Sequence, residues 1–214
     1  TSGTEELFGS QVLSTSGFKS RNAEAYVGIR GVSIGHHAGS SGNESLSLGA
    51  FSGQTSQGNF AIGLGTGAGQ KEQGASGIAI GHESGLIKQG TEGVAIGSYA
   101  GASGQQPNSI AIGERAGQTG QLLRSIAIGS QTGHKNQKKY AIAIGFGAGN
   151  DNQGERSVAI GTQAGFANQA ANSIALNASG NALNPSNAGL FIDPINSGGS
   201  GQVLYYDTTS KEIK

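Results

Sequence analysis

A four-residue phrase recurs along this chain at a fixed interval and limits what the chain can fold into. It starts with Ile or Val, continues with Ala and Ile, and ends with Gly. Its six complete copies span 78–81, 94–97, 110–113, 126–129, 142–145 and 158–161, so every copy starts sixteen positions after the one before it. A further step gives 174–177, with Asn in place of Gly, and weaker, less evenly spaced copies start at Val32, Leu46 and Phe60. A constant period of this length predicts stacked units, none of which folds alone.

The composition supports a repeat fold rather than an ordinary globular core. Of 214 residues, 40 are Gly and only 35% are hydrophobic, whereas the regular spacing argues against a disordered glycine-rich linker. Acidic and basic residues balance at 13 each, which gives no sign of a nucleic-acid partner or of a membrane-bound surface. There is no Cys for disulfides or thiolate metal sites, and no apolar run approaches membrane-spanning length, so we expect no direct membrane insertion.

Each unit reads as one turn of a parallel β structure. The phrase alternates large and small residues, as in Ser109 to Ile112, which is typical of a strand with two different faces. A second Gly follows at the fourth position after the phrase Gly, which indicates a tight turn, and a second short strand such as 121–124 is expected to run back. We therefore predict an all-β chain with a parallel β-roll solenoid over residues 32–180, made of about ten coils of 14–18 residues.

The two flanking segments do not fit the repeat. Residues 1–31 are predicted to form an N-terminal cap or joint, with short strands at 7–8, 12–13 and 26–29. Residues 181–214 are predicted to form a C-terminal β-hairpin transition segment, in which 190–192 and 203–206 are the strands and 196–201 is the loop.

The alternation also suggests how chains associate. If the Ile column fills the thin interior, the Ser/Ala column faces outward, and an uncharged stripe of small residues permits close approach of another backbone. The simplest partner is a second copy of the chain, and cyclic packing then gives a fibre. The interface residues predicted in this way are Ala79, Ala95, Ala111, Ala127, Ala143 and Ala159. The alternative is a narrow monomeric roll with the alanines inside, because period two alone does not assign side-chain direction.

The repeat as a whole, [SA]-[IV]-A-I-G-x-x-[AST]-G over residues 32–180, resembles the YadA-like heads of trimeric autotransporter adhesins. The resemblance implies left-handed parallel β-rolls assembled as a parallel homotrimer, located outside the cell and binding host-surface or matrix ligands. Most coils here are two positions longer than the usual unit of that family. The C-terminal stretch 189–213 is similar to segments of virion and bacterial surface fibres that precede an intramolecular chaperone, which widens the expected parent to a trimeric fibre of a bacterium or a virus.

Candidate binding residues lie in the variable second half of the coils and on exposed aromatic positions. With one repeat between neighbours, Arg124, Tyr140 and Arg156 stack on successive coils. The full set of candidates is Lys135, Lys138, Lys139, Arg124, Tyr140, Arg156, Tyr99, Phe146 and Phe166. One interpretation is a site for anionic glycans. The other is a solvated edge whose cross-strand ion pairs contribute little and discourage aggregation.

Catalytic and metal-binding patterns are weak. The histidines His36, His37, His82 and His134 sit in or near turns and lack metal-ligand spacing, although three copies around an axis would gather them into a ring. No nucleophile elbow, phosphate loop or convincing carboxylate pair is present, so we expect no enzyme activity, no cofactor and no metal site. The predicted function is attachment to a cell-surface receptor or glycan as an extracellular or virion fibre. The alternatives are a structural spacer with the binding tip elsewhere and, less favoured, polysaccharide depolymerisation.

Overall fold

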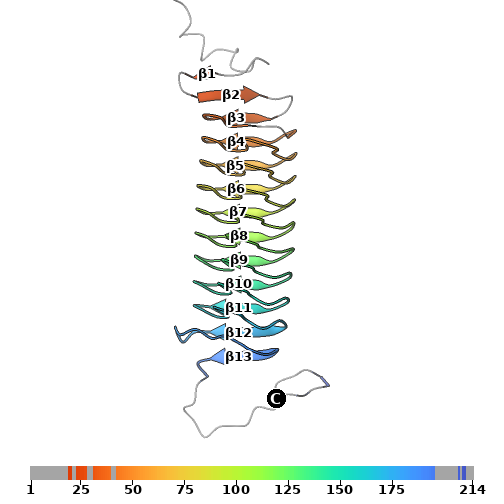
Figure 1. Ribbon diagram of the computed structural model, residues 1–214, viewed down its shortest axis with the longest axis vertical. Helices are drawn as coiled ribbons and strands as arrows, with labels where there is room; N and C mark the ends of the chain where they lie inside the picture. The colour runs from red at the N-terminus through yellow and green to blue at the C-terminus, as the bar shows by residue number, and fades with distance from the viewer. Residues whose placement is uncertain are drawn as a thin grey trace, which may run out of the picture.

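The computed structural model is an elongated all-β solenoid (Figure 1). It describes residues 19–20, 23–27, 31–39, 42–195, 207 and 209–210, and within these residues it contains strands and turns and no helix. Thirteen strands form a single sheet in chain order. The predicted all-β class and the parallel solenoid are therefore confirmed.

The strands are short and, apart from the first two, occur once in each coil. They are β1 (Lys19–Ser20), β2 (Ala23–Val27), β3 (Val32–Ile34), β4 (Leu46–Leu48), β5 (Ile62–Leu64), β6 (Ile78–Ile80), β7 (Val94–Ile96), β8 (Ile110–Ile112), β9 (Ile126–Ile128), β10 (Ile142–Ile144), β11 (Val158–Gly161), β12 (Ser173–Asn177) and β13 (Gly189–Asp193). From β3 to β13 all neighbours pair in parallel. At the N-terminal end β2 runs antiparallel to β3 and β1 pairs antiparallel with β2, so these two strands cover the edge of β3.

Residues one repeat apart occupy equivalent places in successive coils. Ile126 pairs with Ile142, and Ala127 pairs with Ala143. The prediction of a second short strand in each coil is wrong. In its place stands a ladder of single parallel bridges, in which Lys135 pairs with Thr119 on one side and with Asp151 on the other. The backbone on both sides of this ladder turns through left-handed residues, as at Gly133 before Lys135 and Asn136 after it, and cannot continue as a strand.

Two boundaries of the array also differ from the prediction. Ile62 pairs with Leu46, and Gly63 takes the place of the phrase Ala, so the phrase assigned at Phe60 is two positions out of register. With this correction, every coil after the first has the same length up to β12. Leu190 to Ile192 belong to β13, which pairs in parallel with β12 and extends the solenoid beyond residue 180, instead of forming a hairpin arm. The expected strands at 7–8, 12–13 and 203–206, and the 196–201 loop, lie outside the described residues.

The interior is filled by small side chains. The alanine column, Ala79, Ala95, Ala111, Ala127, Ala143, Ala159 and Ala175, has no exposed surface. It packs against a second set of small residues one turn later in the coil, such as Ala100, Ala116 and Ala148. The prediction that the alanines face outward and form the chain–chain interface is therefore wrong, since a coil this narrow has room inside only for small residues. The Ile and Val side chains of the same strands point outward.

A ladder of buried glutamines closes the third side of the interior. The glutamine ladder is Gln57, Gln73, Gln89, Gln105, Gln121, Gln137, Gln153 and Gln169, all at most 3% exposed. Each Nε2 donates to the backbone carbonyl of the first aliphatic residue of a strand at 2.8–3.1 Å, as Gln121 does to Ile110. Several also donate to the Oε1 of the next coil, as Gln121 does to Gln137 at 3.1 Å. These bonds satisfy carbonyls that face the interior and tie neighbouring coils together.

Candidate functional site

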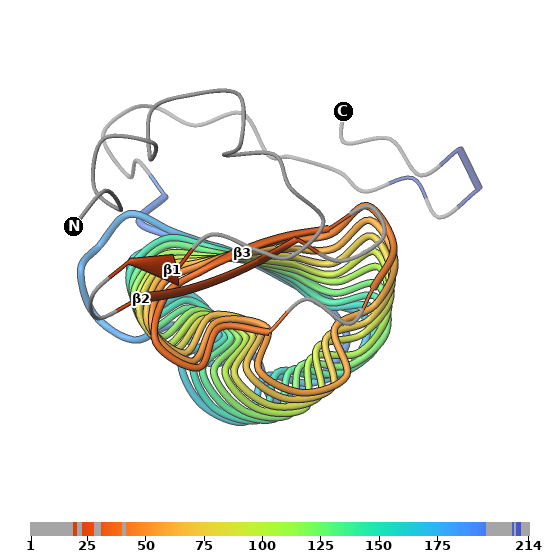
Figure 2. The same ribbon diagram turned by 90° about the horizontal axis from the view of Figure 1, so that it is seen from above.

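The outer surface of the sheet is the most extended feature that could bind a partner. Its residues form the outer aliphatic face: Val32, Ile34, Leu46, Leu48, Ile62, Leu64, Ile78, Ile80, Val94, Ile96, Ile110, Ile112, Ile126, Ile128, Ile142, Ile144, Val158, Ile160, Ile174, Leu176, Leu190 and Ile192. Their side chains are half-buried or exposed, and Ile34, Ile160 and Ile192 are 41–42% exposed. Seen from above, the stacked strands form one flat side of the solenoid (Figure 2). The sequence pattern found these residues but assigned them to the interior.

The predicted stack of Arg124, Tyr140 and Arg156 is present, because the three residues occupy the same place in three successive coils, two positions before the first residues of β9, β10 and β11. Together with Lys138 and Lys139 they form an exposed cluster, here called the basic corner. The Arg156 guanidinium lies over the Tyr140 ring, 5.8 Å from its centroid, which is within cation–π range. The Arg156 Nη1 atom also lies 3.1 Å from the Oε1 atom of Glu155.

Lys135 and His134 lie apart from the basic corner, on the other side of the inward-pointing Gln137. Lys135 belongs to the bridge ladder with Asp151, as the sequence spacing predicts. The His134 Nε2 atom is hydrogen-bonded to Gln118 Oε1 of the preceding coil. Burial, and then the charges of Lys135 and Arg115, lower the pKa of His134, while Asp151 acts in the opposite direction.

Two of the aromatic candidates, Tyr99 and Phe146, follow the carboxyl ends of β7 and β10, whereas Phe166 lies beside the bridge ladder, at the place that His134 occupies two coils earlier. Tyr99 packs edge-to-face on His82, with ring centroids 5.2 Å apart. Phe166 lies against Gly147 of the preceding coil, within 3.5 Å of where a Gly147 Cβ would stand, while Phe146 is 50% exposed. The structure therefore divides the nine predicted binding residues among three separate places and brings together only the five of the basic corner.

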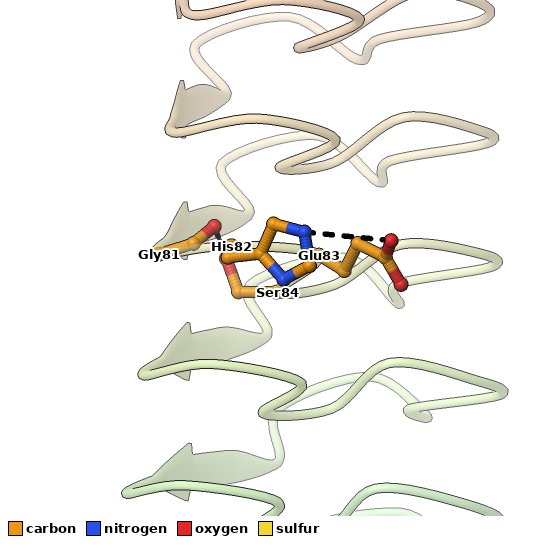
Figure 3. Close-up of polar contacts among 4 residues, drawn as sticks. All are labelled: Gly81, His82, Glu83 and Ser84. Carbon is orange, nitrogen blue, oxygen red and sulfur yellow. Dashed lines mark hydrogen bonds and ion pairs between the residues drawn. The ribbon is translucent and has the colours of Figure 1, made fainter.

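One turn contains a His, an acidic residue and a Ser, the residue types of a catalytic triad, at His82, Glu83 and Ser84 (Figure 3). The Ser84 hydroxyl is buried and donates to the Gly81 carbonyl at 3.2 Å. The His82 imidazole is exposed and lies 3.6 Å from the Glu83 carboxylate. The histidine does not contact the serine, so this turn lacks the nucleophile–base hydrogen bond that a catalytic triad requires.

An apolar hollow lies at the C-terminal end of the outer aliphatic face. It has a volume of about 350 Å³ and is lined by Ile160, Leu176, Ile192, Asn177 and Pro194, among others. It opens where Asn177 replaces the phrase Gly and its side chain donates to the carbonyls of Thr162 and Asn181. Among the described residues, no three His, Cys, Asp or Glu side chains gather as they would around a metal ion.

The glutamine ladder is the structural feature that the sequence reasoning missed. Its signal is visible in the printed sequence, since a Gln recurs at a fixed offset from the first aliphatic residue of the phrase, as Gln121 does after Ile110, in eight successive coils from Leu46 to Val158.

Across the described segments there is no helix of the length and apolarity needed to cross a bilayer. Comparisons with protein-family models, with curated proteins and with solved structures give no match.

Proposed function

We propose that this chain is a segment of a homotrimeric extracellular fibre, borne on a bacterial surface or a virion, that attaches to a cell-surface receptor or glycan. The observation that carries the proposal is the outer aliphatic face. Eleven stacked strands, about 4.8 Å apart, give it a length of about 48 Å. Soluble monomers rarely expose a continuous apolar surface of this extent, and such surfaces mark sites of association.

A second copy of the same chain is the partner that fits this face best. The face repeats at every coil, and another solenoid of the same chain repeats at the same spacing, so aliphatic rows match along their whole length when the copies lie parallel. Cyclic packing of three copies directs every face toward one axis and leaves none in water. Three copies, and the left-handed winding of each, are what the resemblance to YadA-like heads implies.

The attachment role follows from the properties of such a rod. A stiff solenoid holds its exposed side chains at fixed positions, and threefold assembly triples every copy of a weak site. Multivalent contact then gives an avidity above that of any single contact without a deep pocket. The exposed basic corner, separate in the coil from the bridge ladder, is the part of this surface with the chemistry to contact a charged receptor.

Paired charges in the outer face would disrupt association if the proposal holds. Ile112→Lys with Ile128→Lys should convert trimers to monomers, because six like charges would be buried in the assembly. The matched control is Ser103→Lys with Thr119→Lys, which adds the same charge at exposed places on the bridge ladder. Light scattering gives the mass, and circular dichroism checks that both variants fold. Unchanged mass in the first pair would contradict the proposed interface.

A structural spacer is the second candidate, and one observation favours it. Exposed side chains on the solenoid edges pair with their own counterparts on neighbouring coils: Asn136 donates to Asn152 at 3.1 Å and Asn152 donates to Asn168 at 3.2 Å. Such pairs support the stack and require no ligand. Replacing Lys135, Lys138 and Lys139 by Ser distinguishes the two roles, since a spacer keeps the cell binding of the full fibre and an adhesive edge loses it.

A further inference from the structure

The basic corner concentrates positive charge on a chain whose net charge is zero. Arg124, Lys138, Lys139 and Arg156 have one acid beside them, Glu155, which pairs with Arg156, so four positive charges and one negative charge leave a net +3. The same place on the flanking coils is taken by the uncharged Asn108 and Asn172. The patch is therefore confined to three coils rather than continuing along the fibre.

The corner is also a rigid row parallel to the solenoid axis. Arg124, Tyr140 and Arg156 share the left-handed backbone conformation, with φ of 54°, 61° and 54°. The Tyr140 N–H donates to the Leu123 carbonyl and the Arg156 N–H donates to the Lys139 carbonyl, both at 3.1 Å. One coil step is about 4.8 Å, so the two arginines lie about 9.6 Å apart along the axis, with the tyrosine between them.

The residue types in this row suit a polymer of charged sugars. Guanidinium groups bind carboxylates and sulfates through paired hydrogen bonds. Tyr140 is 39% exposed and has an aromatic ring with a polar tip, while half-buried Leu122 and Leu123 on the preceding coil add apolar surface beside it. The apolar hollow lies at the carboxyl ends of β11 to β13, whereas this row precedes the amino ends of its strands, so the hollow is separate from the row. The row extends along the solenoid axis and therefore suits an elongated ligand.

We propose that the basic corner binds a linear anionic polysaccharide lying along the solenoid axis, with the two arginines on its acidic groups and Tyr140 against a sugar ring. This inference rests on the proposed attachment function and names its ligand class. A polysaccharide is favoured over a nucleic acid because the balanced net charge gives little long-range attraction for a densely charged phosphate backbone. A sugar polymer with one acidic group on every sugar, or on every second sugar, needs only the local row.

The test measures binding of the whole chain to an immobilised chondroitin sulfate dodecasaccharide, which has one acidic group per sugar, at physiological salt, with hyaluronan of the same length and single-stranded DNA of equal net charge as comparison probes. Arg124→Ser with Arg156→Ser should lower affinity for the bound glycan roughly tenfold, through loss of charge-assisted hydrogen bonds. Tyr140→Ser should lower it roughly threefold, through loss of ring contact. The control is Lys71→Ser with Lys88→Ser, which removes the same charge from exposed places on other coils and should change affinity less than twofold.

Three outcomes would overturn the inference: no binding of either glycan, an equal loss in the control pair, or DNA bound as tightly as the glycans with the same dependence on the two arginines. Light scattering on the same samples separates the two levels of the account. A trimer that binds no glycan refutes the polysaccharide site alone, whereas a monomer refutes the proposed trimeric fibre whatever it binds.

Discussion

At the scale of single residues, close stacking of the coils requires glycine wherever a Cβ atom would collide with the next coil. The phrase glycines stand with positive φ directly against the next coil, and a Cβ on Gly113 would lie 2.5 Å from the Gly129 carbonyl oxygen. Gly104 also has a positive φ, of 70°, but a Cβ there would meet nothing within 4 Å. The equivalent place on other coils holds Lys88 and Asn136 in the same conformation. Gly113 is thus required because a Cβ atom would collide with the next coil, whereas Gly104 only lowers the energetic cost of the left-handed backbone conformation.

Gly113→Ala and Gly104→Ala should therefore differ in their effect on stability. The first must separate two coils and should lower the free energy of unfolding by about 3 kcal/mol or more. The second adds only the cost of a left-handed Ala, about 1 kcal/mol. Urea unfolding of both variants, followed by circular dichroism, makes the comparison. Equal losses would show that the coils are not packed at the phrase glycines as described.

His134 should make the solenoid less stable as the pH falls. Burial and the neighbouring Lys135 and Arg115 lower its pKa in the folded state below the ordinary value of 6.5. Near pH 6.5 the unfolded chain then binds more protons than the folded one, so stability falls as the pH drops through this region and is restored above it. Urea midpoints at pH 7.5 and 5.5 measure the difference, which should shrink in His134→Gln and in Lys135→Gln. A wild-type midpoint that rises on acidification, or a fall that is unchanged in both variants, would contradict the assignment.

At the scale of the coil, the period was predictable and the direction of the faces was not. Alternation of Ile and Ala defines two faces but is unchanged when the strand is turned over, so the sequence alone left both arrangements open. Volume decides between them, because one coil of this length encloses Ala, Ser and one Gln, and excludes Ile. The exposed stack at Arg124, Tyr140 and Arg156 followed directly from spacing. The division of the other candidates among separate places did not, because spacing does not show which turns share a side.

The glutamine ladder should contribute to stability in proportion to the bonds that each member makes. Gln121→Ala would leave the Ile110 carbonyl and the Gln137 side chain without their donor and would open space in the interior. We expect a loss of about 2–4 kcal/mol, since each buried unsatisfied group costs about 1–3 kcal/mol. The matched control is Gln106→Ala, whose side chain is exposed on the preceding coil and which should change stability by less than about 0.5 kcal/mol. Comparable losses in the two variants would refute the role of the ladder.

At the scale of the whole molecule, the distribution of side chains is opposite to that of an ordinary globular protein. Its interior is made of small and amide side chains, and its large aliphatic side chains lie on one outer side of a rod. With alanines, serines and glutamines inside, a single chain buries little aliphatic surface, and the proposed association through the outer aliphatic face would bury more. The same assembly would carry three copies of the basic corner.

The mass of the chain in solution tests this account most directly. Light scattering at micromolar concentration and physiological salt should give about three times the chain mass of 21.3 kDa. A folded monomer of 21.3 kDa with the same circular dichroism would contradict it, because the outer aliphatic face would then be stable in water without a partner.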